Sequence, residues 1–298
     1  MSGTLGRRRL GNTGMTPCVL GLGCAWFGSD KSSDRDAIEG VRRAIELGID
    51  FLDTSAGYGQ SERRVGLALA GGWREKVYLE TKTGTHPERR GDFSAAGTRW
   101  SVENSLRLLK TEYLDSVLIH DPSDIEVPLA PGACLDELLK MKEEGKVRHL
   151  GIGVRQHEFH RRMIETGHCE IVLTYLDYTL LNQSVARTTL PLARARGVGV
   201  IMASVFGMGL LGGREPDLSR PRPQAYLAHA MWQWCRDRGV NIRHLAMQFC
   251  LHADFDGLVM PGPYNKEKVE EAYEAATAEV DPAVWRAFRA EFGVGLER

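Results

Sequence analysis

Short apolar runs alternate with helix-like segments along most of the 298-residue chain. The runs are rich in Val, Ile and Leu, as buried strands are, and they occupy residues 18–22, 49–52, 77–81, 117–119, 147–152, 171–174, 198–202 and 257–260. Between several of these runs, apolar residues recur at helical spacing, as at Ile38, Val41 and Ile45. Alternation of eight predicted strands with helices favours a closed (β/α)8 TIM barrel of the α/β class over an open doubly wound sheet.

The interval before the last predicted strand is much longer than an ordinary connection between elements. It holds, in order, Pro216, Pro221, Pro223 and two predicted helices at 224–238 and 242–251. We therefore expect an elaborated loop here, at the C-terminal face of the barrel, that acts as a lid or a cofactor cover. Further helices are expected near the C-terminus.

Composition is that of an ordinary globular protein, with 43% hydrophobic and 26% charged residues, and no linker or repeat divides the chain. A single barrel domain spanning 1–298 is therefore expected. The net charge of -1 argues against a nucleic-acid or anionic-membrane partner. No run approaches the ~18 apolar residues of a membrane helix, and the N-terminus lacks the apolar core of a signal peptide. We expect a cytoplasmic protein with a small-molecule substrate, and its oligomeric state stays open.

The six cysteines are widely spaced and form no C-x-x-C pair, so they are expected to be reduced packing residues. His157 and His160 stand three apart near Cys169, but no carboxylate or thiolate partner follows at metal-ligand spacing. No metal site is expected.

Four polar residues stand at or just after the ends of three predicted strands. They are Asp53, Tyr58, Lys82 and His120. The C-terminal ends of the strands of a parallel barrel open onto one face, where active sites are assembled. The four side chains are therefore expected to meet in one pocket.

These residue types fit acid/base chemistry on a carbonyl group. A lysine ammonium beside a tyrosine stabilises the phenolate and lowers the tyrosine pKa from its usual value of ~10. An aspartate would hold the lysine, and a histidine would donate a hydrogen bond that orients the carbonyl oxygen. Because proton transfer alone is not a redox reaction, a nicotinamide cofactor must supply or accept the hydride.

The stretch Gly-Ile-Asp-Phe-Leu-Asp-Thr-Ser-Ala-Gly-Tyr-Gly-Gln-Ser-Glu at 48–62 resembles the signature of the aldo-keto reductases. In that signature an aspartate precedes the catalytic tyrosine by five residues, and Tyr-Gly-x-Ser-Glu follows. Other segments resemble the family's landmarks in the same order: 10–15, the strand ending at Lys82, 113–115 before His120, and 145–153. The resemblance implies a (β/α)8 barrel that uses NAD(P)H. It also implies that Tyr58 is the general acid/base, that Lys82 and Asp53 tune it, and that His120 positions the carbonyl.

Three positions that hold the nicotinamide in the family differ in this chain. Arg155 and Gln156 stand where Ser-Asn is common, and Tyr175 aligns with a glutamine. Ala203 aligns with the aromatic residue that usually stacks on the ring, so Tyr175 or Phe206 is expected to take that role.

The segment after the last predicted strand resembles the family's adenosine-phosphate site. Gly262-Pro263 stand where NADP-preferring members often carry Lys-Ser, Lys268 replaces an arginine, and Ala272 replaces an asparagine near the adenine. Arginine grips a phosphate through a planar two-donor fork, whereas lysine offers a point charge. Weakened selection for the 2'-phosphate is expected, hence use of NAD or of both dinucleotides, and the preference stays open.

Residues 207–212 spell G-x-G-x-x-G directly after a predicted strand. A Rossmann site needs a helix to open there, but Pro216 follows after Arg214-Glu215. The glycines are instead expected to form a loop that closes over the cofactor pyrophosphate. The complete set of expected cofactor contacts is Gly23, Arg155, Gln156, Tyr175, Ser204, Phe206, Gly207, Gly209, Leu210, Gly262 and Lys268.

Trp26 and Phe27 follow the first predicted strand, where members of the family place aromatic residues as a wall of the substrate pocket. Asp121-Pro122 directly after His120 resembles the branch with sugar dehydrogenases of the D-threo-aldose type. Asp121, Trp26 and Phe27 are the expected pocket residues. This likeness, which is an analogy, implies oxidation of a sugar lactol to a lactone.

Three functions remain open from the sequence. The first is an NAD(P)-dependent oxidoreductase that interconverts carbonyl and alcohol groups. The second is a nucleotide-binding accessory subunit with little turnover, and the third is a barrel that performs non-redox sugar chemistry with Asp53 or Glu80. The intact set of four polar residues favours the first.

Overall fold

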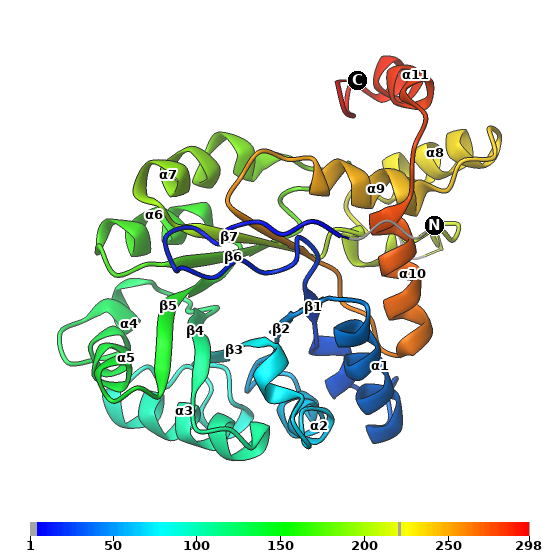
Figure 1. The fold of residues 1–298 in the computed structure, drawn as a ribbon. Helices are drawn as coiled ribbons and strands as arrows, with labels where there is room; N and C mark the ends of the chain where they lie inside the picture. Colours follow the sequence, from blue (N-terminus) through cyan, green and yellow to red (C-terminus); the bar gives the residue numbers. More distant parts are fainter. Residues whose placement is uncertain (1–4, 220–221, 298) are drawn as a thin grey trace.

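The computed structural model describes residues 5–219 and 222–297, so Pro221 and both ends of the expected 1–298 domain lie outside the described residues. Eight strands form one parallel sheet in which neighbours follow the order of the sequence (Figure 1). The strands are β1 (Leu22–Gly23), β2 (Phe51–Asp53), β3 (Tyr78–Thr83), β4 (Leu114–His120), β5 (Val147–Gly153), β6 (Ile171–Tyr175), β7 (Gly199–Ala203) and β8 (Gly257–Met260).

The sheet closes between its first and last strands. A parallel bridge joins Leu20 to Val259, and the Gly21 N–H donates to the Val259 carbonyl at 2.9 Å. Every predicted strand is confirmed, and the predicted (β/α)8 barrel is confirmed with them. The first regular strand is shorter and lies later than the expected 18–22, because residues before Leu22 pair only through isolated contacts.

Helices surround the barrel and follow the strands in alternation (Figure 1). They are α1 (Asp34–Glu46), α2 (Ser61–Ala68), α3 (Ala95–Leu109), α4 (Glu126–Leu129), α5 (Cys134–Glu143), α6 (His157–Glu165), α7 (Thr189–Arg196), α8 (Ala225–Arg236), α9 (Ile242–Leu251), α10 (Lys266–Thr277) and α11 (Pro282–Phe292). Short 3-10 turns are η1 (Ala25–Gly28), η2 (Arg74–Lys76), η3 (Pro87–Arg89), η4 (Ser184–Arg187) and η5 (Gly207–Gly209). Of the helices in the described ranges, none combines the length and apolarity needed to span a bilayer.

Side-chain caps fix where several helices begin. Ser33 and Asp36 form a capping box at the start of α1, which satisfies backbone N–H groups that have no partner inside the helix. At α10, the Asn265 side chain accepts the Lys268 N–H at 3.0 Å. This second cap fixes the first turn of α10 directly after β8, and Lys268 belongs to that turn.

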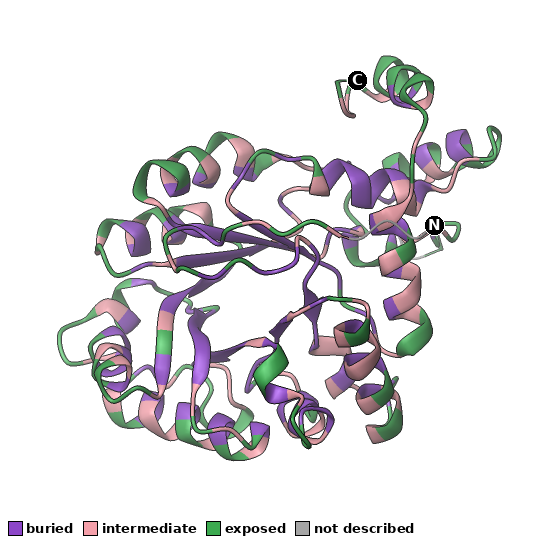
Figure 2. Ribbon diagram, in the orientation of Figure 1, coloured by how far each residue is buried: buried purple, intermediate pink, exposed green. Residues whose placement is uncertain are grey.

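The barrel interior is apolar at its base and polar at its C-terminal end. Phe51, Leu118, Ile201 and Leu258 form part of a buried apolar cluster inside the strands. Figure 2 shows the strands largely buried and the outer faces of the helices exposed. Near the C-terminal ends of β2 and β3, buried polar side chains replace this apolar filling, and Lys82 is only 1% exposed. The core thus gives way to charged groups on the face where barrel active sites form.

Gly28 allows η1 to approach the loop that carries Tyr58. A Cβ on Gly28 would lie 1.7 Å from the Tyr58 carbonyl oxygen, and the Gln60 N–H donates to the Gly28 carbonyl at 3.2 Å. Only a residue without a side chain leaves room for this backbone contact.

We predict that Gly28→Ala lowers the free energy of unfolding by about 1–3 kcal/mol, the usual cost of overpacking. Gly6→Ala is the matched control because a Cβ there meets nothing within 4 Å, and it should change stability by about 0.5 kcal/mol or less. Urea denaturation measures both variants. Equal stability of the two would show that the loop tolerates the extra carbon.

Candidate active site

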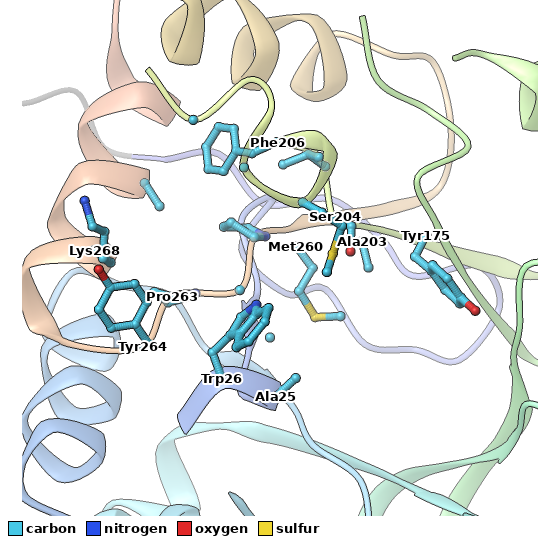
Figure 3. A pocket seen from close by; sticks show the side chains of 18 of the residues that line it. Ala25, Trp26, Tyr175, Ala203, Ser204, Phe206, Met260, Pro263, Tyr264 and Lys268 are labelled. Atoms are coloured by element: carbon cyan, nitrogen blue, oxygen red, sulfur yellow. The ribbon is translucent and has the colours of Figure 1, made fainter. Parts of the chain in front are cut away.

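A cavity of about 520 Å³ opens at the C-terminal end of the barrel. Six of the residues that line it are the last residues of strands: Gly23, Asp53, His120, Tyr175, Ala203 and Met260. Loops after β1, β2, β7 and β8 complete the walls. Figure 3 shows Trp26 and Phe206 on opposite sides of this cavity, with Lys268 and Tyr175 toward its two ends.

Lys82 and Asp53 form a buried ion pair beneath the cavity floor. The Lys82 Nζ also donates to the Thr54 carbonyl at 2.8 Å, and it lies 4.8 Å from the centroid of the Tyr58 ring. The Lys82 charge interacts electrostatically with the Tyr58 hydroxyl and favours its ionised form. Asp53 and Tyr58 line the cavity, whereas Lys82 contacts them without lining it. The structure therefore brings these three predicted residues together.

Burial controls the protonation of Tyr58. Burial raises the pKa of the phenol, the Lys82 ammonium acts against this, and the net pKa lies above its usual value. This differs from the lowering expected from the lysine alone, because loss of hydration is the larger effect. Burial lowers the pKa of Lys82, but Asp53, Tyr58 and Glu80 outweigh it, so the net pKa of the ammonium is raised. Tyr58 is thus a protonated phenol beside a fixed positive charge.

His120 completes the group and faces Tyr58 edge-on, with ring centroids 5.7 Å apart. Its Nδ1 lies 2.9 Å from Thr85 Oγ1 and 3.1 Å from Ser55 Oγ. Two hydroxyl groups that can donate to Nδ1, and a carboxylate oxygen 3.5 Å from Nε2, favour the tautomer with the proton on Nε2.

The imidazole is neutral. Burial, followed by the Lys82 and Arg90 charges, lowers the His120 pKa well below its usual value of 6.5. Its Nε2 lies 3.5 Å from Asp121 Oδ2, and both residues line the cavity. A neutral imidazole of this tautomer presents one N–H donor toward the cavity.

Asp121 and Tyr175 form a second polar contact beside His120. The Tyr175 hydroxyl and the Asp121 carboxylate interact electrostatically, and Asp121 adopts the left-handed region with φ of 41°. Burial raises the pKa of Asp121, and burial together with that carboxylate raises the pKa of Tyr175 to about 12. The pair supplies hydrogen-bonding groups next to the four residues described above.

Of the two aromatic residues expected in the pocket wall, only Trp26 lines the cavity. Lys31 stacks over the Trp26 ring at 4.7 Å. Phe27 has no exposed surface and packs into the core against α1, where a Cβ on Gly40 would lie 2.8 Å from its ring. Consecutive residues of η1 point in different directions, so the sequence pattern did not separate the two roles.

Seven residues expected to contact a cofactor line the cavity, and four do not. Those that line it are Gly23, Tyr175, Ser204, Phe206, Gly209, Gly262 and Lys268. Gly207 and Leu210 are buried inside the loop after β7, where η5 replaces the long helix that a Rossmann site would need.

Arg155 and Gln156 lie away from the cavity lining. Arg155 Nε pairs with Asp177 Oδ1 at 3.1 Å, and His157 Nε2 lies 3.3 Å from the same carboxylate. Gln156 stands immediately before α6 and is exposed. The side chains that differ from the family pattern at this point are therefore engaged in structure or face solvent.

His157 and His160, whose spacing was considered for a metal site, make other contacts. His160 Nδ1 contacts Thr189 Oγ1 at 2.8 Å, and its Nε2 contacts the Val154 carbonyl at 3.0 Å. Across the described ranges, no three side chains of His, Cys, Asp or Glu are arranged to hold a metal ion. Within the same residues the cysteines are free and buried.

The end of the cavity opposite Tyr175 carries charges that the sequence reading missed. Glu271 pairs with Arg243 and accepts two hydrogen bonds of 2.6 Å from Lys268 Nζ. Arg214 also lines this end. Glu271 stands three residues after Lys268 on a predicted helix, a spacing that places side chains together. Arg243 lies on α9, and no nearby sequence pattern indicated that it would reach this cavity.

We predict that the His120 imidazole stays neutral, with the proton on Nε2, from about pH 5 to pH 8. The physical reason is its burial beside the Lys82 charge. Nitrogen NMR of labelled histidine, with His120→Gln to assign the signal, measures this. Titration of that signal near pH 6.5 would contradict the arrangement.

Comparison with known proteins gives consistent results across sequence and structure. The family model described as "Aldo/keto reductase family" matches residues 19–290. L-galactose dehydrogenase from Arabidopsis thaliana is 32% identical over 91% of this chain and 88% of its own length. D-threo-aldose 1-dehydrogenase from a Pseudomonas species is 28% identical over 91% of this chain and 93% of its own length.

Solved structures agree with the sequence matches. The holo form of an aldo-keto reductase from Bacillus halodurans superposes with a TM-score of 0.82, at 25% identity, over 97% of this chain and 96% of that one. The predicted family is therefore confirmed, and with it the prediction of an enzyme that uses NAD(P)H. The chain belongs to the aldo/keto reductase family of NAD(P)-dependent oxidoreductases.

Proposed function

We propose that this enzyme interconverts a carbonyl and an alcohol with Tyr58 as the general acid/base. The observation that carries the proposal is the buried Lys82–Asp53 ion pair, whose ammonium contacts the Tyr58 phenol beside a neutral His120. A fixed positive charge next to a phenol stabilises the phenolate that proton transfer creates.

Each residue has a distinct part in the reduction. The nicotinamide of NAD(P)H, when bound, supplies the hydride that reaches the carbonyl carbon. Tyr58 donates its phenolic proton to the carbonyl oxygen, and Lys82 stabilises the phenolate that is left. His120 Nε2–H donates a hydrogen bond to the same oxygen and so orients it. In the oxidation, the phenolate takes the hydroxyl proton as the hydride leaves.

The lining of the cavity fits a dinucleotide. Gly23 ends β1 and Gly262 lies two residues after β8, where a Cβ would lie 3.1 Å from the Trp26 ring. Phe206 and Trp26 offer apolar faces across the cavity (Figure 3). Tyr58 and His120 would face the nicotinamide end, and Lys268 with Arg243 would face the adenosine end. Because Ala203 is small and the Tyr175 hydroxyl interacts with Asp121, Phe206 is the better candidate for stacking on the nicotinamide.

The proposed substrate is a hydroxylated aldehyde sugar that is oxidised from lactol to lactone. Two relatives are named as sugar dehydrogenases, which supports this class. Asp121 and Tyr175 stand beside His120 and can accept and donate hydrogen bonds to sugar hydroxyls. A role as an accessory subunit without turnover would leave the complete set around Tyr58 without a purpose, so we place it second.

We predict that Tyr58→Phe lowers kcat about 10²- to 10⁴-fold, the usual contribution of a positioned acid/base. Nicotinamide absorbance with an aldose substrate measures the rate. Cofactor affinity, followed by tryptophan fluorescence, should stay within about threefold because the ring remains in place.

Tyr226→Phe is the matched control, because Tyr226 is 67% exposed and does not line the cavity. It should keep the unaltered rate. Full turnover in Tyr58→Phe would show that Tyr58 is not the acid/base. If the unaltered protein binds a dinucleotide without turnover, the accessory role is favoured instead.

We infer that the enzyme favours NAD over NADP, because Glu271 pairs with Arg243 and Lys268, two of the cations that line the proposed adenosine end. We predict that Glu271→Gln frees Lys268 and Arg243 and tightens NADPH binding roughly tenfold or more, the value of one hydrogen bond between charged groups. NADH affinity should change much less. Fluorescence titration with both cofactors measures the effect.

Glu270→Gln is the control for the same chemical change on the same helix, because Glu270 pairs with Arg43 at 2.8 Å and does not line the cavity. If NADPH binds the two variants equally, Glu271 does not set the preference.

A further inference from the structure

Glu80 is a buried acid at the heart of the barrel that has no part in the mechanism above. It lies on β3 with 0% of its surface exposed, two residues before Lys82. In the sheet register it stands directly across from Asp53 on β2 and from Ser116 on β4. Side chains at matched positions of adjacent strands share one face, so Glu80 and Asp53 point into the same interior layer.

The two oxygens of Glu80 are in different situations. The Ser116 hydroxyl donates to Oε2 at 2.6 Å. Oε1 is buried and receives no hydrogen bond from any donor among the described residues. Its neighbour is the Asp53 carboxyl group, which occupies the matched position on β2 and interacts electrostatically with Glu80. Two carboxylates cannot hydrogen bond to each other unless one of them carries a proton.

The positive charge nearby is committed to Asp53. The Lys82 ammonium donates to Asp53 and to the Thr54 carbonyl, and it contacts Tyr58. On β5, His149 stands across from Ser116 and is occupied by Glu170 at 2.7 Å. With one ammonium facing two carboxyl groups in a dry interior, full ionisation of both acids would leave a buried charge without compensation.

We propose that Glu80 holds a proton and donates it in a hydrogen bond to Asp53, so that the pair presents a single negative charge to Lys82. Glu80 is then a positioning residue of the acid/base group and never touches the substrate. The charges of Glu80, Asp53, Lys82 and Tyr58 sum to zero in this state. The kinetic part of the proposal rests on the proposed role of Tyr58, and the protonation itself does not.

The electrostatic environment agrees with this geometry. Burial, and then the Asp53 charge, raise the pKa of Glu80 to about 8, with Lys82 and Ser116 acting against them. Burial also raises the pKa of Asp53, but there the Lys82 ammonium opposes it by direct contact. The proton therefore resides on Glu80, which lacks a direct contact with the ammonium, and the two carboxyl groups titrate as a pair.

The first test is the pH dependence of stability in Glu80→Gln. The folded-state pKa of about 8 lies above the usual 4.5. The stabilisation from the neutral acid is therefore fully present below about pH 4.5 and is lost as the pH rises through about 8. Glutamine cannot ionise, and its amide can still donate to Asp53 and accept from Ser116. Between about pH 4.5 and pH 8, the free energy of unfolding of Glu80→Gln should therefore fall less than that of the unaltered protein.

A second variant, Ser116→Ala, keeps the carboxyl group and removes the donor that favours its ionised form. The stability loss should then shift to higher pH. If Glu80→Gln and Ser116→Ala both follow the unaltered protein, Glu80 is ionised throughout and the proposal is wrong. Urea denaturation at a series of pH values provides these curves without any need for turnover.

The kinetic test is the pH profile of kcat for alcohol oxidation. Ionisation of Glu80 adds a negative charge that acts on Lys82, so the ammonium stabilises the Tyr58 phenolate less and the phenolate is harder to form. In Glu80→Gln the profile should therefore reach its plateau roughly one pH unit lower than in the unaltered enzyme, on the order expected for one partly screened buried charge. KM should change little, because Glu80 does not line the cavity.

Glu62→Gln is the matched control. Glu62 is a buried carboxyl on α2 that accepts from Thr81 at 2.6 Å, on the outer side of β3. Its kcat profile should shift much less than that of Glu80→Gln, because the Lys82 charge has only a minor effect on Glu62. An identical profile for Glu80→Gln and Glu62→Gln would overturn the coupling to Tyr58. If no alcohol is oxidised at all, the proposed function fails, and the stability curves still decide whether Glu80 holds the proton.

Discussion

The buried Lys82–Asp53 ion pair is the constraint on which the rest of the site depends. Removing two charges from water costs several kcal/mol for each, and loss of one partner from such a pair typically costs about 3–5 kcal/mol. The barrel compensates with the Thr54 carbonyl, which accepts from the ammonium at 2.8 Å. Gly153 on β5 lies beside the lysine stem, where an added Cβ would make an ordinary van der Waals contact at 3.5 Å. A pair held this rigidly provides a fixed charge beneath Tyr58 and keeps His120 neutral.

The barrel converts this local constraint into a cavity. Each of six strands ends in a residue that lines it, so residues far apart in the sequence line one cavity. The loop that carries Tyr58 is held by close backbone contact with Gly28. The long interval between β7 and β8 supplies Ser204, Phe206 and Gly209 to the opposite wall. Asp53, Lys82 and His120 are thus on strands, whereas Tyr58 and the side expected to contact cofactor are on loops.

Much of this arrangement could be predicted from the sequence. The strands were predictable because buried parallel strands are continuous apolar runs, and the four polar residues were predictable because they end or follow those runs. The direction of the Tyr58 pKa shift could not be predicted from the sequence. Burial of the phenol depends on the closed barrel, and its effect on the pKa outweighs that of the neighbouring lysine. Phe27 and Arg155 were misplaced because side-chain direction in a turn, and a partner such as Asp177, are set by tertiary structure. Arg243 and the Asp53–Glu80 contact arise from packing between distant segments, for which a single sequence has no signal.

The central claim is that a hydride moves between the substrate and a nicotinamide in this cavity. The most direct measurement is transfer of deuterium from an aldose labelled at its C1 carbon, with mass spectrometry of the reduced cofactor. We predict that deuterium appears in the reduced nicotinamide and that the sugar is recovered as its lactone. The claim would be contradicted if the labelled sugar were recovered unoxidised while the cofactor was bound but not reduced. The same result would have to hold for simpler alcohols labelled at the carbinol carbon.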